Sequence, residues 1–275
     1  MKKAFIFEWK RMMHSPSLWF SLIAAGLIII GDVLQWFLMY LRGVDVSTGV
    51  FYKWLGINRG MHIGIYFFLA LPLLTAMAYS WTVSHDRNTG YAAQVINRVG
   101  RRKYFAAKFL VTFLSGGIVF AGALILDFML LATFSPAYRP WPGDLASAMD
   151  PFHFCSELFY RNPYVFCLLW CGVAFLWGGT MSCMGAAAGM LTKKRVLSGI
   201  MPFLLFTAQP VAVAFILQHY RITIYGHSVN LTWTEMLNAG NMLPTLPEHI
   251  LATIGVLLGI STLIYVLRGW KYECL

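Results

Sequence analysis

The sequence predicts an all-α integral membrane protein with six transmembrane helices. Only 12% of its 275 residues are charged and 59% are hydrophobic, whereas soluble domains are about 25% charged. Six apolar stretches are long enough to cross a bilayer, and Lys and Arg gather on alternate connections between them. The composition therefore excludes an ordinary soluble domain, and the charge pattern predicts an orientation.

Each apolar stretch is close to the roughly 20 residues that a helix needs to cross the hydrocarbon core. The first is about twice as long as the apolar core of a signal peptide, and no clear small-x-small cleavage site follows it, so we expect it to be retained. The predicted spans are Leu18–Leu41, Ile63–Val83, Phe109–Phe134, Tyr164–Leu191, Val196–Leu217 and Ile250–Leu267.

Lys and Arg are divided unevenly between the two sides of these spans. With both termini in the cytosol, the inner segments hold 15 of the 21 Lys and Arg residues, as the positive-inside rule requires. The same rule accounts for the formal net charge of +10 without nucleic-acid binding. We therefore expect a multi-pass protein of a bacterial plasma membrane, in contact with membrane lipid, with both termini cytosolic.

Residues 1–17 predict a helix lying in the plane of the membrane interface. Aromatic and methionine side chains share one helical face and basic side chains share the other, which is typical of interfacial helices. Ser15 and Pro16 then turn the chain into the first span. The alternative is an ordinary basic lead-in that only sets topology. The two faces are Phe5, Trp9, Met12 and Met13 against Lys3, Lys10, Arg11 and His14.

The segment 84–108 is the most basic internal connection. Its six cations accompany a single acid, Asp86, so the segment should face the cytosol. Gly90 interrupts the chain after Asp86, and apolar residues then recur at helical spacing, which predicts a short amphipathic helix on the inner face of the membrane. The cations are Arg87, Arg98, Arg101, Arg102, Lys103 and Lys108, and the apolar positions are Tyr91, Val95, Ile96 and Val99.

Two long connections, 135–163 and 218–249, fall on the outer side. The first carries five prolines among several aromatic residues, which predicts an ordered aromatic cap. The second contains an apolar, proline-broken piece, Met236 to Pro247, that is too short to span and is a candidate re-entrant segment. We treat residues 1–275 as a single transmembrane domain.

Small and polar residues mark positions inside the spans. Gly185 with Gly189, and Gly255 with Gly259, have the spacing of close helix contacts.

Asp32 and Gln35 lie in the first span and Asp127 in the third. A buried carboxylate costs roughly 2.5 to 3.5 kcal/mol on insertion scales. These side chains therefore either bond to a neighbouring helix or the outer interface, or line a polar translocation path.

The common catalytic motifs are absent from the sequence. No Gly-Lys dipeptide occurs, which excludes a P-loop, and neither H-E-x-x-H nor G-x-S-x-G is found. The histidines are scattered singly, and Cys167 with Cys171 is a weak metal candidate, so we expect no catalytic residue and no metal. Any dependence on ATP must come from a partner.

The order of these features resembles the permease subunits of type-two ABC exporters, the six-span partners of a separate ATPase. The resemblance covers the whole chain: an interfacial helix, an acid-to-glycine motif at Asp86, Arg87 and Gly90, basic residues entering the third span, a tight basic turn after the fourth, and a long outer segment before the sixth. The family usually has Glu at the position of Asp86 and a small hydroxyl residue at that of Tyr91.

This resemblance implies a type V ABC exporter-like fold. It implies that a coupling helix, Asp86 to Val99, sits in a groove of an ABC ATPase subunit that binds ATP and Mg²⁺, and that the chain pairs with a second permease, identical or different. The first, second and fifth spans would bound the path. The coupling residues would be Asp86, Arg87, Gly90, Val95, Arg98, Arg101 and Arg102, with Phe5, Trp9 and Arg11 as the brace and Asp32, Gln35 and Asp127 as path candidates.

The function expected from the resemblance is ATP-driven export, with no enzymatic activity or cofactor on this chain. The aromatic outer cap and the scarcity of charge in the spans favour an amphipathic substrate, such as an antimicrobial peptide, a drug or a lipid-like molecule. One alternative is an ATPase-linked subunit for peptide immunity or sensing. Another is an intramembrane enzyme acting on lipid or peptide, with Asp127 and outer-loop histidines as acid and base.

Overall fold

Six helices long and apolar enough to cross a membrane make this chain a multi-pass, all-α membrane protein. The computed structural model contains no strand in the part of the chain that it describes. The described residues are 2–43, 49–58, 62–142, 149, 153–192, 194–220, 232–240 and 246–270.

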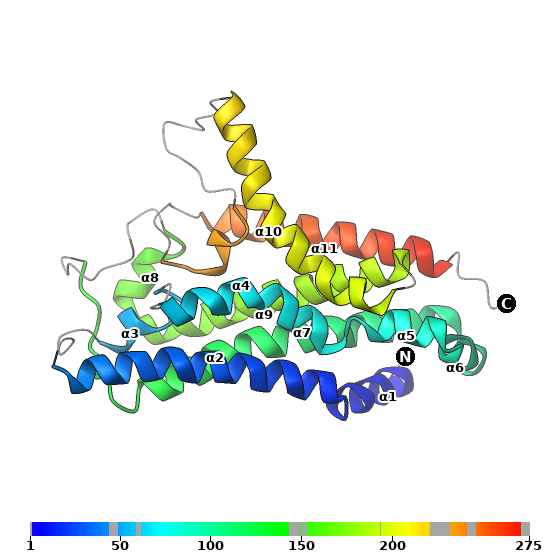
Figure 1. Ribbon diagram of the computed structural model, residues 1–275, viewed down its shortest axis with the longest axis horizontal. Coiled ribbons are helices and arrows are strands. Elements are labelled where there is room, and N and C mark those ends of the chain that lie inside the picture. The colour runs from blue at the N-terminus through cyan, green and yellow to red at the C-terminus, as the bar shows by residue number, and fades with distance from the viewer. Residues whose placement is uncertain are drawn as a thin grey trace.

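The long helices lie side by side, with shorter helices at both ends of the bundle (Figure 1). The spans are α2 (Pro16–Leu41), α4 (His62–Tyr79) continued by α5 (Thr82–Asn88), α7 (Arg101–Leu131), α9 (Pro163–Leu191), α10 (Arg195–Tyr220) and α11 (Pro247–Trp270). The shorter elements are α1 (Lys2–Met13), α3 (Val50–Lys53), α6 (Tyr91–Val99), α8 (Ser156–Arg161) and the 3₁₀ turn η1 (Glu235–Leu237).

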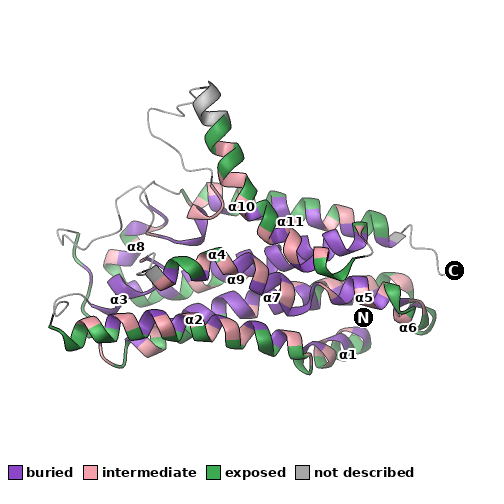
Figure 2. Cartoon of the chain, in the orientation of Figure 1, coloured by how far each residue is buried: buried purple, intermediate pink, exposed green. Residues whose placement is uncertain are grey.

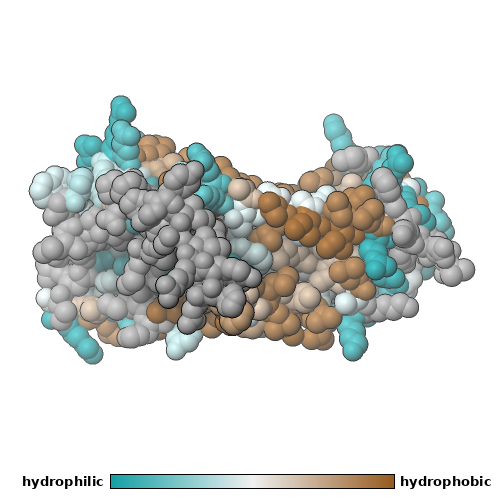
Figure 3. Space-filling view, turned by 90° about the horizontal axis from the view of Figure 1, so that it is seen from above, coloured by the Kyte–Doolittle hydropathy of each residue, from teal (hydrophilic) through white to brown (hydrophobic). Residues whose placement is uncertain are grey.

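The two ends of the bundle carry different elements. Figure 1 places α1, α5, α6 and the end of α11 together, which we call the α6 end, and α3 with α8 at the opposite, α3 end. On the face seen in Figure 3, hydrophobic side chains form a band across the middle and hydrophilic side chains lie towards both ends. This distribution matches a bilayer crossed by the middle of the bundle.

The predicted span boundaries were wrong at the α6 end. The second span runs on from Tyr79 through α5 to Asn88, and α7 begins at Arg101 rather than Phe109. With 31 residues, α7 is about 46 Å long, which exceeds the roughly 30 Å hydrocarbon core. Its first basic turns therefore extend past the apolar layer as regular helix.

The predicted helix from Asp86 to Val99 is also interrupted. Gly90 has a φ of +71° and Gly100 a φ of +90°, and both values favour glycine. Asp86 consequently lies in α5, at the end of the second span, and only Tyr91–Val99 forms the separate helix α6. The short amphipathic helix predicted after Gly90 is therefore present as α6, whereas the single helix from Asp86 to Val99 that the resemblance implied was wrong.

α9 is the central helix of the bundle, and every residue from Trp177 to Met190 on it is buried. α7 crosses it at backbone contact, because a side chain at Gly116 would collide with the carbonyl oxygen of Gly178. A Cβ at Gly185 would lie 2.6 Å from Ser80 Oγ, which confirms a close helix contact there. At the predicted pair in α11 the described residues make no such contact, since none of them lies within 4 Å of a Cβ placed at Gly255 or Gly259.

Two irregular segments, 49–58 and 232–240, close the α3 end of the bundle. Trp54 and Leu55 are fully buried, and the Trp54 indole Nε1 donates to the carbonyl oxygen of Leu124 at 2.9 Å. Asn238 Nδ2 donates to the carbonyl oxygens of Leu55 and Asn58, each at 2.8 Å. We call these two segments the outer plug, after the side of the membrane that the sequence predicts for them.

The predicted re-entrant segment, Met236 to Pro247, is described only in part. Residues Met236 to Ala239 are buried in the protein, as that prediction requires, and they form one 3₁₀ turn followed by irregular chain. Residues 241–245 lie outside the described part. Residues 50–57 are all buried as well, although hydropathy places them in an ordinary outer connection.

The aromatic connection 135–163 is ordered where it is described. Phe154 and Phe159 are buried, the Tyr160 hydroxyl donates to the Met149 carbonyl at 2.6 Å, and Arg139 Nε donates to the Tyr160 carbonyl at 2.8 Å. Residues 143–148 and 150–152 fall outside the described part.

The second half of α10 projects from the bundle in Figure 1, and Figure 2 shows its described residues as mostly exposed. Val211 is 70% exposed and Phe215 71% exposed. This projecting helix thus has an apolar surface that the described part of the chain leaves largely exposed.

Candidate functional site

The most concentrated buried chemistry lies at the α6 end, where charged residues from α1, α5 and α7 meet with tyrosines from α4 and α7. We call this group the ion network: Glu8, Arg11, Tyr79, Asp86, Tyr104 and Lys108.

α1 contributes Glu8 and Arg11 because its packed face runs through Ala4, Glu8 and Met12, one helical turn apart. Arg11 was predicted to lie on the polar face of this helix, opposite Phe5 and Trp9. Instead its guanidinium turns inward, with the side chain 27% exposed. Phe5 and Trp9 do pack against the core, and their rings stack with centroids 6.1 Å apart.

Asp86 is the centre of the ion network. Arg11 binds it with both guanidinium nitrogens: Nη1 lies 2.7 Å from Oδ2 and Nη2 lies 2.5 Å from Oδ1. Lys108 Nζ lies 2.8 Å from Oδ2, and the Tyr104 hydroxyl donates to the same oxygen at 2.9 Å. Asp86 is 1% exposed, so its carboxylate is occupied inside the chain.

Lys108 joins the two acids. Its Nζ lies 3.2 Å from Glu8 Oε2 as well as 2.8 Å from Asp86 Oδ2. The Tyr79 hydroxyl donates to Glu8 Oε2 at 2.7 Å. Two acids and two bases balance the formal charge, which is the condition for burying charges at tolerable cost.

The ion pair with Asp86 changes the pKa of Arg11. Burial by itself would lower the pKa of Arg11, but the hydrogen bond and charge of Asp86 outweigh burial and raise the pKa above its usual value. Arg11 therefore stays protonated at any physiological pH, and the bidentate pair is permanent.

The ion network is joined directly to α6. The Arg11 guanidinium lies over the Tyr91 ring, 4.4 Å from its centroid, a cation–π contact that links α1 to the start of α6. Ala92 and Ile96 form the buried face of α6 and pack with Tyr104 of α7. Gln94, Asn97 and Arg98 form the exposed face.

The other predicted coupling residues divide between interior and surface. Arg87 Nη1 donates to the carbonyl oxygen of Met190 at 3.0 Å, near the end of α9. Val95 is half-buried beside Ala92 and Ile96, and Arg101 is also half-buried, whereas Arg102 is exposed. Arg98 and Arg102 are therefore available to a partner, and Arg87 ties α5 to α9.

The predicted path residues lie far from this site, near the α3 end. Asp32 and Asp127 are both fully buried. Asp127 Oδ2 accepts a hydrogen bond of 2.8 Å from the backbone nitrogen of Leu55, so this carboxyl group holds the outer plug. Gln35 is half-buried one turn from Asp32. The hydrogen bond to Leu55 favours the alternative in which Asp127 bonds within the protein over the one in which it lines a translocation path.

Sequence reasoning missed Glu8, Tyr79 and Tyr104 as members of the ion network. Glu8 is the one acid among residues 1–17, and its spacing of three from Arg11 was a signal that could have been used. Lys53 was also missed: it is 2% exposed, and its Nζ lies 3.2 Å from Ser135 Oγ. No sequence pattern shows that a lysine in an outer connection is buried.

Among the described residues, no group of three or more His, Cys, Asp or Glu side chains is placed to hold a metal ion. Cys167 and Cys171 lie on α9 as free cysteines.

The chain is similar to the "Uncharacterized protein YybM" of Bacillus subtilis (strain 168), with 23% identity over 129 residues. That match covers 46% of this chain and 49% of the relative, so the chain spans about half the length of the curated relative it matches. No family model matches the chain. No solved structure matches it.

Proposed function

We propose that this chain is the transmembrane subunit of an ATP-driven exporter with a type V ABC exporter-like fold, coupled to a separate ABC ATPase subunit that binds ATP and Mg²⁺. The observation that carries the proposal is α6. This short helix lies at a polar end of the bundle, its inner face is fixed to α1 and α7, and its outer face is exposed.

α6 has the connections that a force-transmitting element needs. Gly90 and Gly100 bound it, so it can change direction at both ends. Through Tyr91 and Tyr104 it meets the ion network, which holds α1, α5 and α7 together. A displacement of α6 by a closing ATPase would therefore move these helices together, as domain coupling requires.

In this mechanism Asp86 and Arg11 transmit the movement from inside the chain. Arg98 and Arg102 are the residues that we assign to the ATPase surface, with Val95 and Arg101 beside them. Phe5 and Trp9 brace α1 against the core.

Pairing with a second permease, identical or different, accounts for the uncovered half of α10. Val211 and Phe215 lie beyond Pro210 on a helix that leaves the bundle, and a second bundle beside α10 would bury them.

A path bounded by α2, α4 and α10 suits an amphipathic substrate. Asp32 and Asp127 are buried within the chain, so few charged side chains would face that substrate.

An ATPase-linked immunity or sensing subunit would use α6 in the same way. The intramembrane enzyme receives less support, because a catalytic acid must reach its substrate. Asp127 is fully buried and bonded to the backbone of the outer plug.

The decisive experiment asks whether an adjacent reading frame encodes a chain with a Walker-type glycine-lysine motif. That chain is then co-expressed with this one, and copurification and ATP hydrolysis are measured in nanodiscs. Arg98→Glu reverses a charge on the exposed face of α6, and we expect at least a tenfold weaker association with the ATPase. Arg161→Glu, an exposed charge on α8 at the opposite end, is the matched control and should leave association unchanged.

Two results would refute the proposal. One is export of a labelled amphipathic peptide from vesicles that contain the purified chain and no ATPase. The other is equal ATPase association for wild type and Arg98→Glu, with the ATPase bound at the α3 end.

A further inference from the structure

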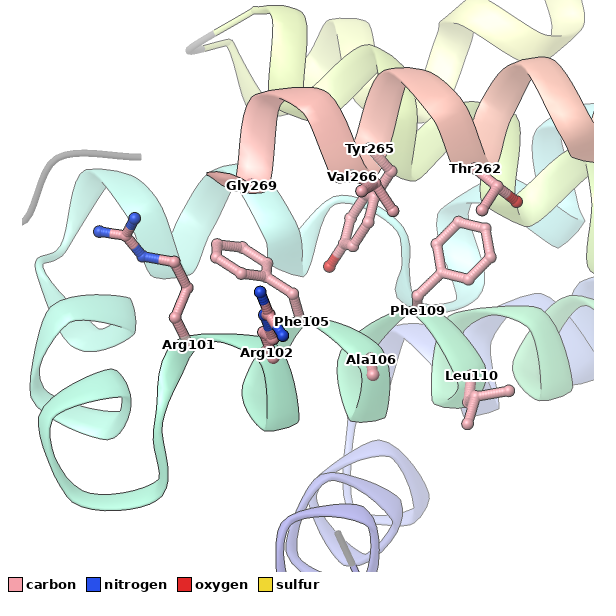
Figure 4. Close-up of a pocket in the computed structure, with 10 residues that line it drawn as sticks. All are labelled: Arg101, Arg102, Phe105, Ala106, Phe109, Leu110, Thr262, Tyr265, Val266 and Gly269. Atoms are coloured by element: carbon pink, nitrogen blue, oxygen red, sulfur yellow. The ribbon is translucent and has the colours of Figure 1, made fainter. Parts of the chain in front are cut away.

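An amphipathic slot lies between α7 and α11 at the α6 end of the bundle (Figure 4). It has a volume of about 330 Å³ and is lined by Arg101 and Arg102 at one end and by apolar side chains beyond them. The apolar residues that define it are Phe105, Phe109, Leu110 and Val266.

The polarity of the slot changes along the membrane normal. Arg101 and Arg102 stand in the first turn of α7, and Leu110 lies about 13 Å further along that helix. Leu110 is 44% exposed and Val266 37% exposed, so the slot opens sideways, towards the region that lipid occupies. A phospholipid has the same order of polarity over this distance, from headgroup to acyl chain.

The polar end of the slot carries two positive charges, those of Arg101 and Arg102. No Asp or Glu is among the described residues that line it, and the positive end of the α7 helix dipole lies at the same place. Basic pockets between transmembrane helices on the cytoplasmic side recognise anionic lipid headgroups, and each Lys or Arg near the membrane surface contributes to that attraction.

We infer that this slot binds one anionic phospholipid of the inner leaflet. Its phosphate lies against Arg101 and Arg102, and part of an acyl chain lies between Phe105, Phe109 and Val266. The volume suits a chain of methylene groups, whereas a helix of a second protein, about 10 Å across with its side chains, would not enter. Arg101 and Arg102 also belong to the surface that we assign to the ATPase, so the lipid site is tested on the chain alone, without the ATPase.

The slot also touches the packing of α6. Phe105 lines the slot and packs with Ala92, Ile96 and Tyr104, which fix the inner face of α6. A bound lipid would therefore hold Phe105 in place and reduce the opening of α6. This gives the site a regulatory consequence that amide exchange can measure.

The test is lipid binding by the purified full chain in nanodiscs. We compare phosphatidylglycerol with phosphatidylcholine and count retained lipids by native mass spectrometry. Wild type should retain one phosphatidylglycerol at least tenfold more tightly than phosphatidylcholine, and that lipid should slow amide exchange in 91–99.

Two variants with matched controls assign the site. Arg101→Ala with Arg102→Ala removes the charge, and Val266→Trp fills the apolar part; each should abolish the tenfold preference. Lys103→Ala, an exposed neighbour that does not line the slot, and Leu263→Trp, 60% exposed elsewhere on α11, should both retain it. Circular dichroism and gel filtration verify that each variant is folded.

Three outcomes would overturn the inference. Equal retention of the two lipids by wild type would show that the slot does not select an anionic headgroup. If Lys103→Ala lost the preference for phosphatidylglycerol as fully as the arginine variant, the lipid would be attracted by the basic surface in general and not by the slot. Unchanged retention in Val266→Trp would place the lipid elsewhere on the protein.

Discussion

At the scale of single residues, Asp86 holds the α6 end together, because it accepts from Arg11, Lys108 and Tyr104. Replacing Asp86 with Asn would leave the buried Lys108 and the half-buried Arg11 without their main partner. Breaking a buried ion pair on one side costs about 3 to 5 kcal/mol. We therefore expect Asp86→Asn to lower the free energy of unfolding by that amount, measured by denaturant titration in detergent.

The control is Glu157→Gln on α8, an exposed acid whose loss should change stability by less than about 0.5 kcal/mol. Adding Lys108→Met to Asp86→Asn should recover part of the loss, since the second change removes the uncompensated base. A loss below about 1 kcal/mol in Asp86→Asn would contradict the geometry of the ion network.

Two buried tyrosines should respond differently to loss of the hydroxyl group. The Tyr104 hydroxyl donates to the Asp86 carboxylate, and a hydrogen bond to a charged group contributes about 1.5 to 3 kcal/mol. The buried Tyr265 hydroxyl has no hydrogen-bond partner among the described residues. We expect Tyr104→Phe to lower the melting temperature and Tyr265→Phe to leave it unchanged or raise it.

The two variants are matched in chemistry and depth, so differential scanning fluorimetry can compare them directly. If both variants lowered the melting temperature by the same amount, the Tyr265 hydroxyl would also make a stabilising hydrogen bond, which would contradict this prediction.

At the scale of elements, the crossing of α7 and α9 depends on two glycines in backbone contact. A methyl group at Gly178 would collide with the carbonyl oxygen of Gly116, and the backbone cannot yield as a flexible side chain does. Gly178→Ala should therefore separate the two helices and cost several kcal/mol, of the order of 2 to 5. Gel filtration after heating would follow the loss of folded protein.

Gly172 provides the matched control on the same helix, because nothing lies within 4 Å of a Cβ at that position. Gly172→Ala should be neutral or stabilising by about 0.5 to 1 kcal/mol, as expected for glycine in a helix interior. Tolerance of both substitutions would rule out backbone contact between α7 and α9.

The attachment of α6 should depend on the backbone conformation of Gly90. Nothing lies within 4 Å of a Cβ placed there, so a side chain meets no clash, and the cost comes from the positive φ. A residue other than glycine loses roughly 1 to 2 kcal/mol in this conformation, while Asn tolerates it better. Gly90→Val should therefore speed amide exchange in 91–99 more than Gly90→Asn does.

Equal exchange rates in the two Gly90 variants would mean that the segment relaxes without cost. In that case α6 would not be held in one orientation by its first turn.

Hydropathy located all six long helices, because length and apolar composition are local properties. It misplaced the boundaries at the α6 end, since Lys108 lies inside a helix and is neutralised by Glu8 and Asp86 from distant parts of the chain. It also missed the outer plug. The burial of Trp54 and Leu55 follows from contacts with Leu124, Asp127 and Asn238, which no local pattern contains.

The candidate site was only partly predictable for the same reason. The basic segment and its glycine pointed to α6, and the aromatic face of α1 pointed to Phe5 and Trp9. The inward turn of Arg11 required a buried acid opposite it, and Asp86 comes 75 residues later in the chain. Pairing across that separation is a property of the fold.

At the scale of the whole molecule, the excess of cations at the α6 end predicts which side of the membrane it faces. We expect Arg98 in the cytosol and Arg161 outside. In a variant without native cysteines, Arg161→Cys should react with an impermeant maleimide in intact cells, and Arg98→Cys only after permeabilisation. The reverse pattern would invert the orientation and exclude a cytosolic partner at α6.

The pairing of Glu8 with Lys108 has a consequence for biosynthesis. These residues are 100 positions apart, so the ribosome completes two membrane spans before the lysine that neutralises the acid emerges. Until then Glu8 has only the looser ion pair with Arg11 of its own helix, at 3.7 Å, and α1 stays at the water-exposed surface of the bilayer. Insertion of the third span releases it, and the amino-terminal helix is thus docked late, although it is made first.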